Sequence, residues 1–595
     1  MGAFSGFRAF VPVLSILPAP HALPGSRPPA GKRTRLRRLT GDVGRGGLLA
    51  CLVSALLVAL PVIALVMIAG TGSGDLWPHL AAYVLPQALL DSLILLLGVG
   101  ALTITLGSAA AWLVTACDFP GRRLLDWALL LPLAVPAYII AYAWLDLWHP
   151  VGMPQTMLRE LLGYDNPRDL RLPDIRSMGG CILVLGLALY PYVYLPARAA
   201  FRTQAAELME AARLLGSGPW RCFFRVALPL ARPAIAAGAS LALMETLNDI
   251  GAAEFLGVRT LTVAIYSTWN NRSSLAGAAQ IALFMLGIVL TLLFAERWAR
   301  RHRHYAASAR QNRRLARARL SGWAGWLACA LASLPVALGF LLPVGYLVVE
   351  AGKRVRFDGI DPAIWIEVGN TCKVSALATL FVTALAFMLV NVQRRADRPL
   401  TRGLARVAGM GYAIPGVVLA LGMMAFVGAL DNALSAALER GFGLSVGLLL
   451  TGTSFMLVYA CVARFLAVGV GGIEAGFCRI PHSIDDAARV LGAGAWRVAA
   501  RVHLPLGWQA IAAAMLLAFV DCAKELPATL LLRPMNFETL ATHLYGEAAR
   551  GTYESAAIAA LLIVLVGLPP VILLSRQGND APSAAARAPL DGKAA

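Results

Sequence analysis

Two pairs of carboxylates lie inside long apolar stretches of the sequence, where an ionised side chain is costly. Glu245 and Asp249 form the first pair, and Asp521 and Glu525 form the second. A spacing of four residues would place each pair on one face of a helix. Acids at membrane depth typically line water or meet partners, so by default they mark a route for an ion or solute. Their oxygens also suit a hard cation.

Three interpretations of these acids stay open. They could pair with Lys524 or with helix ends and hold the fold together, they could line a pathway or gate, or they could bind a metal ion directly. A pathway must release what it carries, so tight coordination is the least expected of the three. No metal site and no catalytic residue is assigned.

A second pattern occurs twice, with an acid, two alanines, a glycine and a Leu-Pro pair at identical spacings. The first copy contains Glu210, Ala211, Ala212, Gly216, Val226, Leu228 and Pro229. The second copy contains Asp486, Ala487, Ala488, Gly492, Val502, Leu504 and Pro505. The acid-Ala-Ala-Arg run favours a short helix, and the glycine supplies a left-handed residue to end it. Pro219 is well placed in the first turn of a second helix.

The resulting helix-turn-helix would present a face of small residues that fits a groove in a partner protein. The plain alternative is an amphipathic loop in which Glu210 pairs with Arg213 one turn away. Two copies in register, at corresponding places in the chain, favour the docking interpretation.

The composition indicates an all-α polytopic membrane protein. Of 595 residues, 58% are hydrophobic and the mean hydropathy is +0.68, which is more apolar surface than one water-soluble core can bury. A spanning helix needs roughly 20 apolar residues. About twelve segments qualify, at positions 47–70, 87–116, 124–148, 179–200, 233–255, 276–294, 322–349, 368–392, 409–430, 444–466, 510–532 and 555–574.

The twelve segments form two parallel repeats of six. Asp91-Ser92-Leu93 aligns with Asn370-Thr371-Cys372, and Leu133-Ala134-Val135-Pro136 aligns with Tyr412-Ala413-Ile414-Pro415, at one constant offset. Six is an even number, so both copies have the same orientation. The expected organisation is a basic disordered tail (1–46), a first domain (47–296, loop 203–232), a basic linker (297–321), a second domain (322–575, loop 479–509) and a second tail (576–595).

The distribution of charge predicts the orientation. With a cytoplasmic amino terminus, the inward-facing loops collect about 38 of the 52 Lys and Arg residues, as the positive-inside rule requires. Both termini and both repeated loops are then cytoplasmic. The net charge of +19 lies in short loops beside the membrane, so anionic lipid explains it better than nucleic acid does. The nine cysteines show neither disulfide nor metal-ligand spacing.

The duplicated loop resembles the EAA motif of ABC importer permeases, with Val226 and Val502 in place of Ile and Asp486 in place of Glu. The resemblance spans roughly residues 50 to 575 and is greatest to the fused two-half permeases of ferric-iron uptake systems. Supporting stretches run from Leu243 to Gly251, from Lys524 to Pro534 and from Asn536 to Ala541. Permeases for thiamine, phosphonates or polyamines share much of this plan.

The resemblance implies that each loop is a coupling helix that docks on an ATPase. The implied coupling residues are Glu210, Ala211, Ala212, Gly216, Pro229, Asp486, Ala487, Ala488, Gly492 and Pro505. It also implies two copies of a cytoplasmic ABC ATPase, a periplasmic solute-binding protein and a location in the bacterial inner membrane. No phosphate-binding loop is present, so ATP and Mg²⁺ would be bound by the partner and this chain would carry no cofactor.

Two other classes of protein predict different behaviour. An ion-coupled secondary transporter of two times six helices would work without an ATPase and gives the duplicated loop no role. An intramembrane enzyme would need a cluster of His, Ser or Cys residues, and none has ligand-like or catalytic spacing.

Overall fold

The computed structural model describes residues 45–164, 166, 170, 172–203, 212, 214–300, 317–395, 399–444 and 447–577. In this part of the chain the structure is helical except for turns and one short parallel pairing of β1 (Cys117–Asp118) with β2 (Ala318–Arg319). This confirms the all-α prediction. Most of the predicted tails and of the linker lies outside these residues.

The first repeat contains the helices up to residue 300. They are α3 (Arg45–Gly70), α4 (Leu76–His79), η1 (Leu80–Val84), α5 (Leu85–Ala116), α6 (Arg122–Ala128), η2 (Leu131–Ala134), α7 (Ala137–Leu147), α8 (Met153–Leu162), α9 (Met178–Thr203), α11 (Pro219–Cys222), η3 (Phe223–Ala227), α12 (Leu228–Asn248), α13 (Gly251–Phe255), α14 (Leu261–Arg272) and α15 (Leu275–Arg300).

The second repeat contains the helices from residue 323 onward. They are α16 (Trp323–Val336), η4 (Ala337–Leu341), α17 (Leu342–Phe357), α18 (Ala363–Arg395), α19 (Pro399–Ala408), η5 (Gly411–Ala413), α20 (Gly416–Phe442), α21 (Phe455–Phe477), α22 (His482–Val490), α23 (Ala495–Val498), η6 (Ala499–His503), α24 (Leu504–Ala523), α25 (Pro527–Leu532), α26 (Leu540–Arg550) and α27 (Tyr553–Gln577).

Among the described residues, eleven helices are long and apolar enough to cross a membrane, and one bent pair raises the number to twelve. The predicted count is therefore confirmed. Equivalent residues also make equivalent contacts in the two repeats. The Ser92 hydroxyl accepts the Leu261 N–H at the start of α14, and the Thr371 hydroxyl accepts the Leu540 N–H at the start of α26, both at 2.9 Å.

The third span of the first repeat is bent, so the expectation of one continuous segment over 124–148 is wrong. Its two parts, Arg122–Ala134 and Ala137–Leu147, meet at 92°. Val135 adopts an extended conformation because the residue before a proline avoids the helical region, and Pro136 then begins α7. In the second repeat Pro415 likewise begins α20, which runs beyond the predicted 409–430.

The tenth span also differs from its predicted bounds of 444–466. The helix α21 occupies Phe455–Phe477. The predicted span stops at residue 466, whereas the helix continues through a glycine-rich end. Gly469 and Gly472 are buried there against neighbouring helices, where a Cβ would meet Val382 and Ala514 at 2.8 and 2.7 Å. Close packing, which sequence periodicity does not report, overrides the low helix propensity of glycine.

Four turns of π-helix each lie directly before a Leu-Pro pair. They are η1, η3, η4 and η6, followed by Pro86, Pro229, Pro343 and Pro505. Proline lacks an N–H and its ring crowds the preceding turn, so the helix widens there rather than breaking. The Leu-Pro pair of the repeated loop thus joins the loop to its spanning helix through a widened turn.

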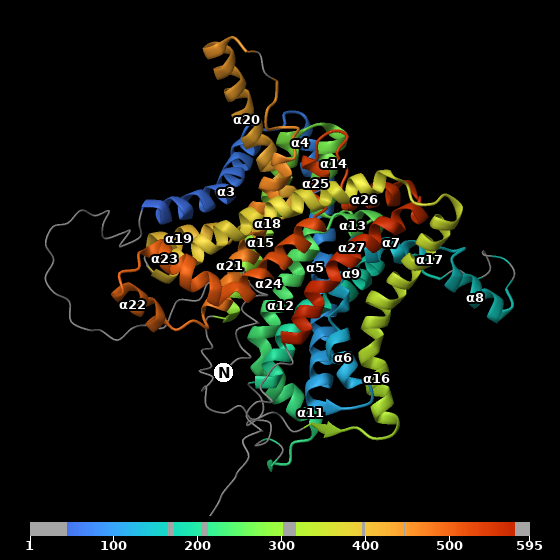
Figure 1. The fold of residues 1–595 in the computed structure, drawn as a ribbon. Coiled ribbons are helices and arrows are strands. Elements are labelled where there is room, and N and C mark those ends of the chain that lie inside the picture. Colours follow the sequence, from blue (N-terminus) through green and yellow to red (C-terminus); the bar gives the residue numbers. More distant parts are fainter. Residues whose placement is uncertain are drawn as a thin grey trace, which may run out of the picture.

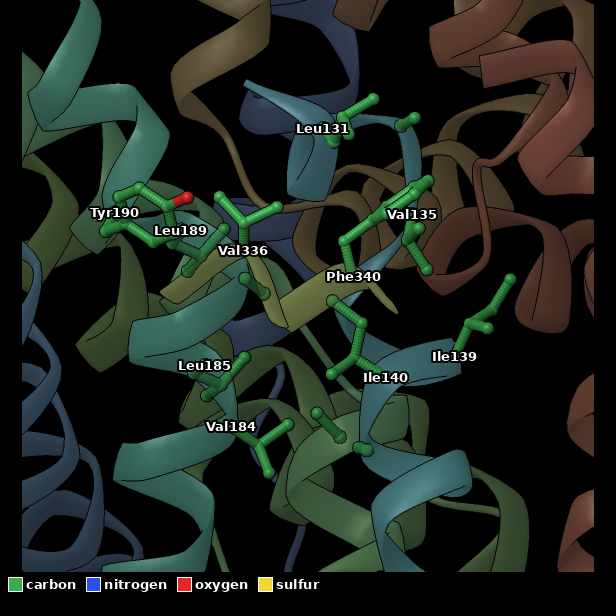
Figure 2. Close-up of a cluster of buried hydrophobic side chains, with 14 of the residues drawn as sticks. Leu131, Val135, Ile139, Ile140, Val184, Leu185, Leu189, Tyr190, Val336 and Phe340 are labelled. Carbon is green, nitrogen blue, oxygen red and sulfur yellow. The ribbon is translucent and has the colours of Figure 1, made fainter. Parts of the chain in front are cut away.

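The first spanning helix of each repeat packs against helices of the other repeat. The helix α3 packs against α18, α19 and α20, whereas α16, η4 and α17 pack against α6, α9 and α7. Figure 1 shows α3 beside the second-repeat helices and α16 beside α6. In Figure 2, Val336 and Phe340 lie among Leu185, Leu189 and Ile140 of the first repeat. The two repeats therefore share their buried cores.

We predict that Gly422→Leu weakens the packing of α3 against α20. A Cβ on Gly422 would lie 2.1 Å from the Pro61 carbonyl oxygen of α3, so α3 must move away. Overpacking of this kind costs about 1–3 kcal/mol. The melting temperature of the purified protein in detergent should fall. The matched control is Gly428→Leu on the same helix, where a Cβ meets no atom within 4 Å. Equal melting temperatures for the two variants would contradict the contact.

Candidate functional site

A cavity of about 90 Å³ lies where the two repeats meet. Helices α12, α13, α24 and α25, the bends at Pro136 and η5, and helices α9 and α21 all contribute to its lining. All four predicted acids line it: Glu245, Asp249, Asp521 and Glu525. Residues separated by 276 positions in the sequence are thus brought together around one space.

The first-repeat acids are held by neutral donors. Glu245, near the end of α12, accepts a hydrogen bond of 2.6 Å from the Tyr412 hydroxyl of the second repeat. Asp249 accepts the Ala252 N–H at 2.6 Å. Between them, the Asn248 side-chain oxygen accepts the Gly416 N–H at 2.8 Å, a second bond across the repeat boundary.

The second-repeat acids are held by cations. Asp521 lies 2.8 Å from the Lys524 ammonium group. Glu525 pairs with the Arg464 guanidinium at 2.5 Å, and both side chains are only 5% exposed. Four acids and two cations therefore surround the cavity, and both cations belong to the second repeat.

The expectation that each pair of acids shares a helix face is wrong. Helix α12 ends at Asn248 and α24 ends at Ala523, so Asp249 and Glu525 lie beyond the helix ends. Each instead accepts the N–H three residues ahead, Ala252 at 2.6 Å and Ala528 at 3.0 Å, and so caps the short helix α13 or α25. This matches the structural interpretation of the acids, yet both still line the cavity.

Sequence reasoning missed five polar residues that line this cavity, namely Tyr138, Tyr192, Asn248, Tyr412 and Arg464. A signal for Arg464 was available, because it is a lone arginine in an apolar run, and intramembrane charges usually mark function. Tyr412 and Asn248 carried no such signal, since their roles depend on tertiary contacts.

The described side chains do not form a preformed metal site. In the part of the chain that the structure describes, no three His, Cys, Asp or Glu side chains are grouped closely enough to hold a metal ion. The acids of the cavity are engaged with donors and cations instead. The cavity lining therefore offers no preformed storage site for a metal ion, although its four acids outnumber its two cations.

In the second repeated loop the first helix, α22, ends just before its glycine as predicted, and the glycine of the first loop has the same backbone conformation. Gly216 and Gly492 adopt φ values of +78° and +77°, the left-handed conformation that glycine accepts without strain. Helix α11 begins at Pro219, as expected. Of the predicted coupling residues, Glu210 and Ala211 lie outside the described residues. In the second copy the Asp486 carboxylate and the Arg489 guanidinium are 3.6 Å apart, so the plain local pairing is present there.

Large apolar side chains stand exposed just before both glycines. Leu214 and Leu215 are 88% and 86% exposed, and Val490 and Leu491 are 87% and 86% exposed. Six spans separate the loops, namely α12, α15, α16–α17, α18, α20 and α21. Because that number is even, both loops emerge on the same side of the bundle. Paired apolar tips of this kind are typical of contact surfaces.

These features define a membrane protein of two six-helix repeats with twin exposed loops and a polar cavity between the repeats. The family described as binding-protein-dependent transport system inner membrane component matches residues 103–304. The Fe(3+)-transport system permease protein FbpB 2 of Haemophilus influenzae is 24% identical over 493 residues, which cover 82% of this chain and 90% of that protein.

Two shorter relatives match at higher identity. The molybdenum transport system permease protein ModB of Escherichia coli is 30% identical over 197 residues, 32% of this chain and 82% of that protein. The putative 2-aminoethylphosphonate transport system permease protein PhnU of Salmonella choleraesuis is 33% identical over 208 residues, 34% of this chain and 71% of that protein. The chain belongs to the family of binding-protein-dependent inner-membrane components, the permease subunits of ABC importers.

We predict that Arg464→Met destabilises the protein strongly, because it leaves Glu525 buried without a cation. Removing one partner of a buried pair costs about 3–5 kcal/mol. The double variant Arg464→Met with Glu525→Gln should recover most of that loss, since it buries no unpaired charge. Thermal unfolding of both variants in detergent measures the difference. Equal stability of the single and double variants would show that the pair is not buried as described.

Proposed function

We propose that this permease carries ferric iron and that the cavity between the repeats lies on its path. The observation that supports this most is the convergence of four acids on one space, because carboxylate oxygens suit a hard cation. The similarity to FbpB 2, which extends through most of both chains, supports the same cargo. A thiamine, phosphonate or polyamine cargo is the alternative within the same architecture.

A phosphonate cargo has a specific observation in its favour. Arg464 and Lys524 line the same cavity. A bound anion could form ion pairs with these two cations in place of the acids that pair with them now. The relative PhnU is described as a putative permease for 2-aminoethylphosphonate transport. An uptake assay in proteoliposomes distinguishes the iron proposal from the phosphonate proposal. Radiolabelled ferric iron and radiolabelled 2-aminoethylphosphonate are each supplied together with the binding protein of the transport system. Uptake of the phosphonate without uptake of iron would reject the iron proposal.

The partners we propose are two copies of a cytoplasmic ABC ATPase and a periplasmic solute-binding protein. The exposed apolar tips at Leu214, Leu215, Val490 and Leu491 support one docking surface for each ATPase. ATP and Mg²⁺ would be bound by those partners, with no cofactor in this chain. An ion-coupled secondary transporter would instead show uptake in the absence of any ATPase.

The orientation we propose has both loops and both termini in the cytoplasm and the chain in the bacterial inner membrane. The positive-inside bias supports it. Closing of the two ATPases would then draw the loops together and open the pathway toward the opposite side. Because the repeats exchange their first helices, movement at one loop would pass to both repeats.

We predict that replacing the acids with amides impairs uptake while the complex still assembles. In Glu245→Gln the amide oxygen can still accept the Tyr412 hydroxyl, so the fold is kept and only the charge is lost. Uptake should fall on the order of tenfold, which corresponds to about 1.4 kcal/mol. We expect a loss of uptake also for the other three acid-to-amide changes, Asp249→Asn, Asp521→Asn and Glu525→Gln.

The control for this series is Glu439→Gln at an exposed position of α20, which makes the same chemical change away from the cavity. Its uptake should equal that of the unmodified protein. Full uptake by all four cavity variants would reject the pathway assignment.

We predict that Gly492→Leu abolishes co-purification of the ATPase. An L side chain in the left-handed conformation costs about 1–2 kcal/mol, so the turn after α22 must change shape. Gly494→Leu is the matched control, because Gly494 has φ −68° and open space around its Cβ direction. Gly216→Leu should act in the same way in the first loop. Normal assembly of both left-handed variants would refute docking at these loops.

A further inference from the structure

One residue of the exposed helix α22 is buried. Asp485 is 3% exposed, whereas its neighbours Ile484 and Asp486 are exposed. Its carboxylate accepts hydrogen bonds from Arg394 Nε at 2.6 Å and from His503 Nε2 at 2.8 Å. Burial opposes ionisation, but the bonds from Arg394 and His503 hold the pKa of Asp485 below its ordinary value. The helix is therefore fixed by an ionised group on its inner face.

The Arg394 guanidinium connects Asp485 to the ends of two other helices. Arg394, at the end of α18, also donates to the carbonyl oxygens of Phe477 and Ile480, at 2.7 and 2.6 Å, where α21 ends. Its guanidinium thus joins α18, α21 and α22. A planar guanidinium can serve several acceptors at once in a fixed geometry, which a lysine could not reproduce.

The ring of His503 completes the cluster. This residue lies in η6, immediately before the Leu-Pro pair that begins α24, and it is fully buried. Its Nδ1 lies 2.6 Å from the Asn391 side-chain oxygen, and the Asn391 amide N–H₂ donates to the Phe387 carbonyl at 2.8 Å. Both ring nitrogens are therefore engaged, one with α18 and the other with α22.

The first repeat has no equivalent of this cluster in its sequence. The positions that align with Arg394, Asp485 and His503 hold Thr115, Met209 and Ala227. The position of Asn391 holds Trp112, whose ring lies 5.5 Å from the ring of Phe201 and 5.1 Å from that of Phe223. At these aligned positions the first repeat therefore lacks the charged groups of the second, and its buried ion pairs lie elsewhere, between Asp126 of α6 and the arginines Arg198 and Arg202 of α9.

We propose that Asp485 is the positioning residue that transmits movement of the second coupling helix to α18 and α24, a role the first repeat performs without it. The inference rests on the proposed docking of an ATPase at α22. Apolar contacts can slide, but a buried carboxylate held by a guanidinium and an imidazole cannot leave its partners without a large cost. A displacement of α22 therefore moves α18 and α24 together with it. The two ATPases then act on the permease through different sets of contacts, charged in the second repeat and without this cluster in the first.

The test combines a local measurement with a coupling measurement. Two variants break the joint: Asp485→Asn removes the charge, and His503→Ala installs the residue of the first repeat. A spin label at Val490 reports the mobility of α22 in the permease alone, and a label at Leu214 in the first loop is the internal reference. The permease is then expressed with the ATPase of its own transport system, and cargo transported per ATP hydrolysed is measured in proteoliposomes.

We expect the Val490 label to become more mobile in both variants while the Leu214 label is unchanged. The ATPase should remain bound, and cargo per ATP should fall at least about fivefold. The control is His543→Gln, which removes another His–carboxylate pair of 2.8 Å, with Glu367 in α18, away from the coupling loops. It should leave the coupling ratio unchanged.

Two results would overturn the proposal: an unchanged Val490 label with an unchanged coupling ratio, or an equal loss of coupling in the His543→Gln control. If the ATPase does not bind even the unmodified permease, the docking proposal fails. The label measurement then still decides whether the joint holds α22.

Discussion

An ionised side chain inside a membrane protein must find a partner, and for one of the cavity acids that partner lies across the boundary between the two repeats. Glu245 of the first repeat is bound by Tyr412 of the second, and Asn248 binds the backbone of Gly416. Within the second repeat, Arg464 neutralises Glu525 at the wall of the same cavity. The cost of leaving any of these groups unpaired fixes how the two repeats meet.

The exchange of first helices gives this arrangement its rigidity. With α3 packed on the second repeat and α16–α17 on the first, neither repeat buries its core alone. The proline-linked π-turns then connect loop and span on each side without a flexible break. If the repeated loops dock an ATPase as we propose, a displacement at either loop would pass through these turns into α12 and α24, which line the cavity.

Much of this architecture could be predicted from the sequence, because it depends on local signals. Apolar length gives the spans, the aligned motifs give the repeat, and Gly216 and Gly492 give the helix ends. What could not be predicted depends on tertiary contacts: the bend at Pro136, the packing that keeps the glycine-rich end of α21 helical, and the helix exchange. The sequence indicates the four acids, but their spacing predicts helix faces for Asp249 and Glu525, which instead cap the next helices.

If the cavity between the repeats lies on the transport path as we propose, it must open to solution during transport. Ala188 lines the cavity and is 3% exposed, so a single cysteine there, in a variant without the nine native cysteines, is a minimal probe. We predict that a membrane-impermeant maleimide modifies this cysteine slowly in the resting permease and much faster when the binding protein and ATP are present. Equally slow modification in every state of the transport cycle would contradict the account.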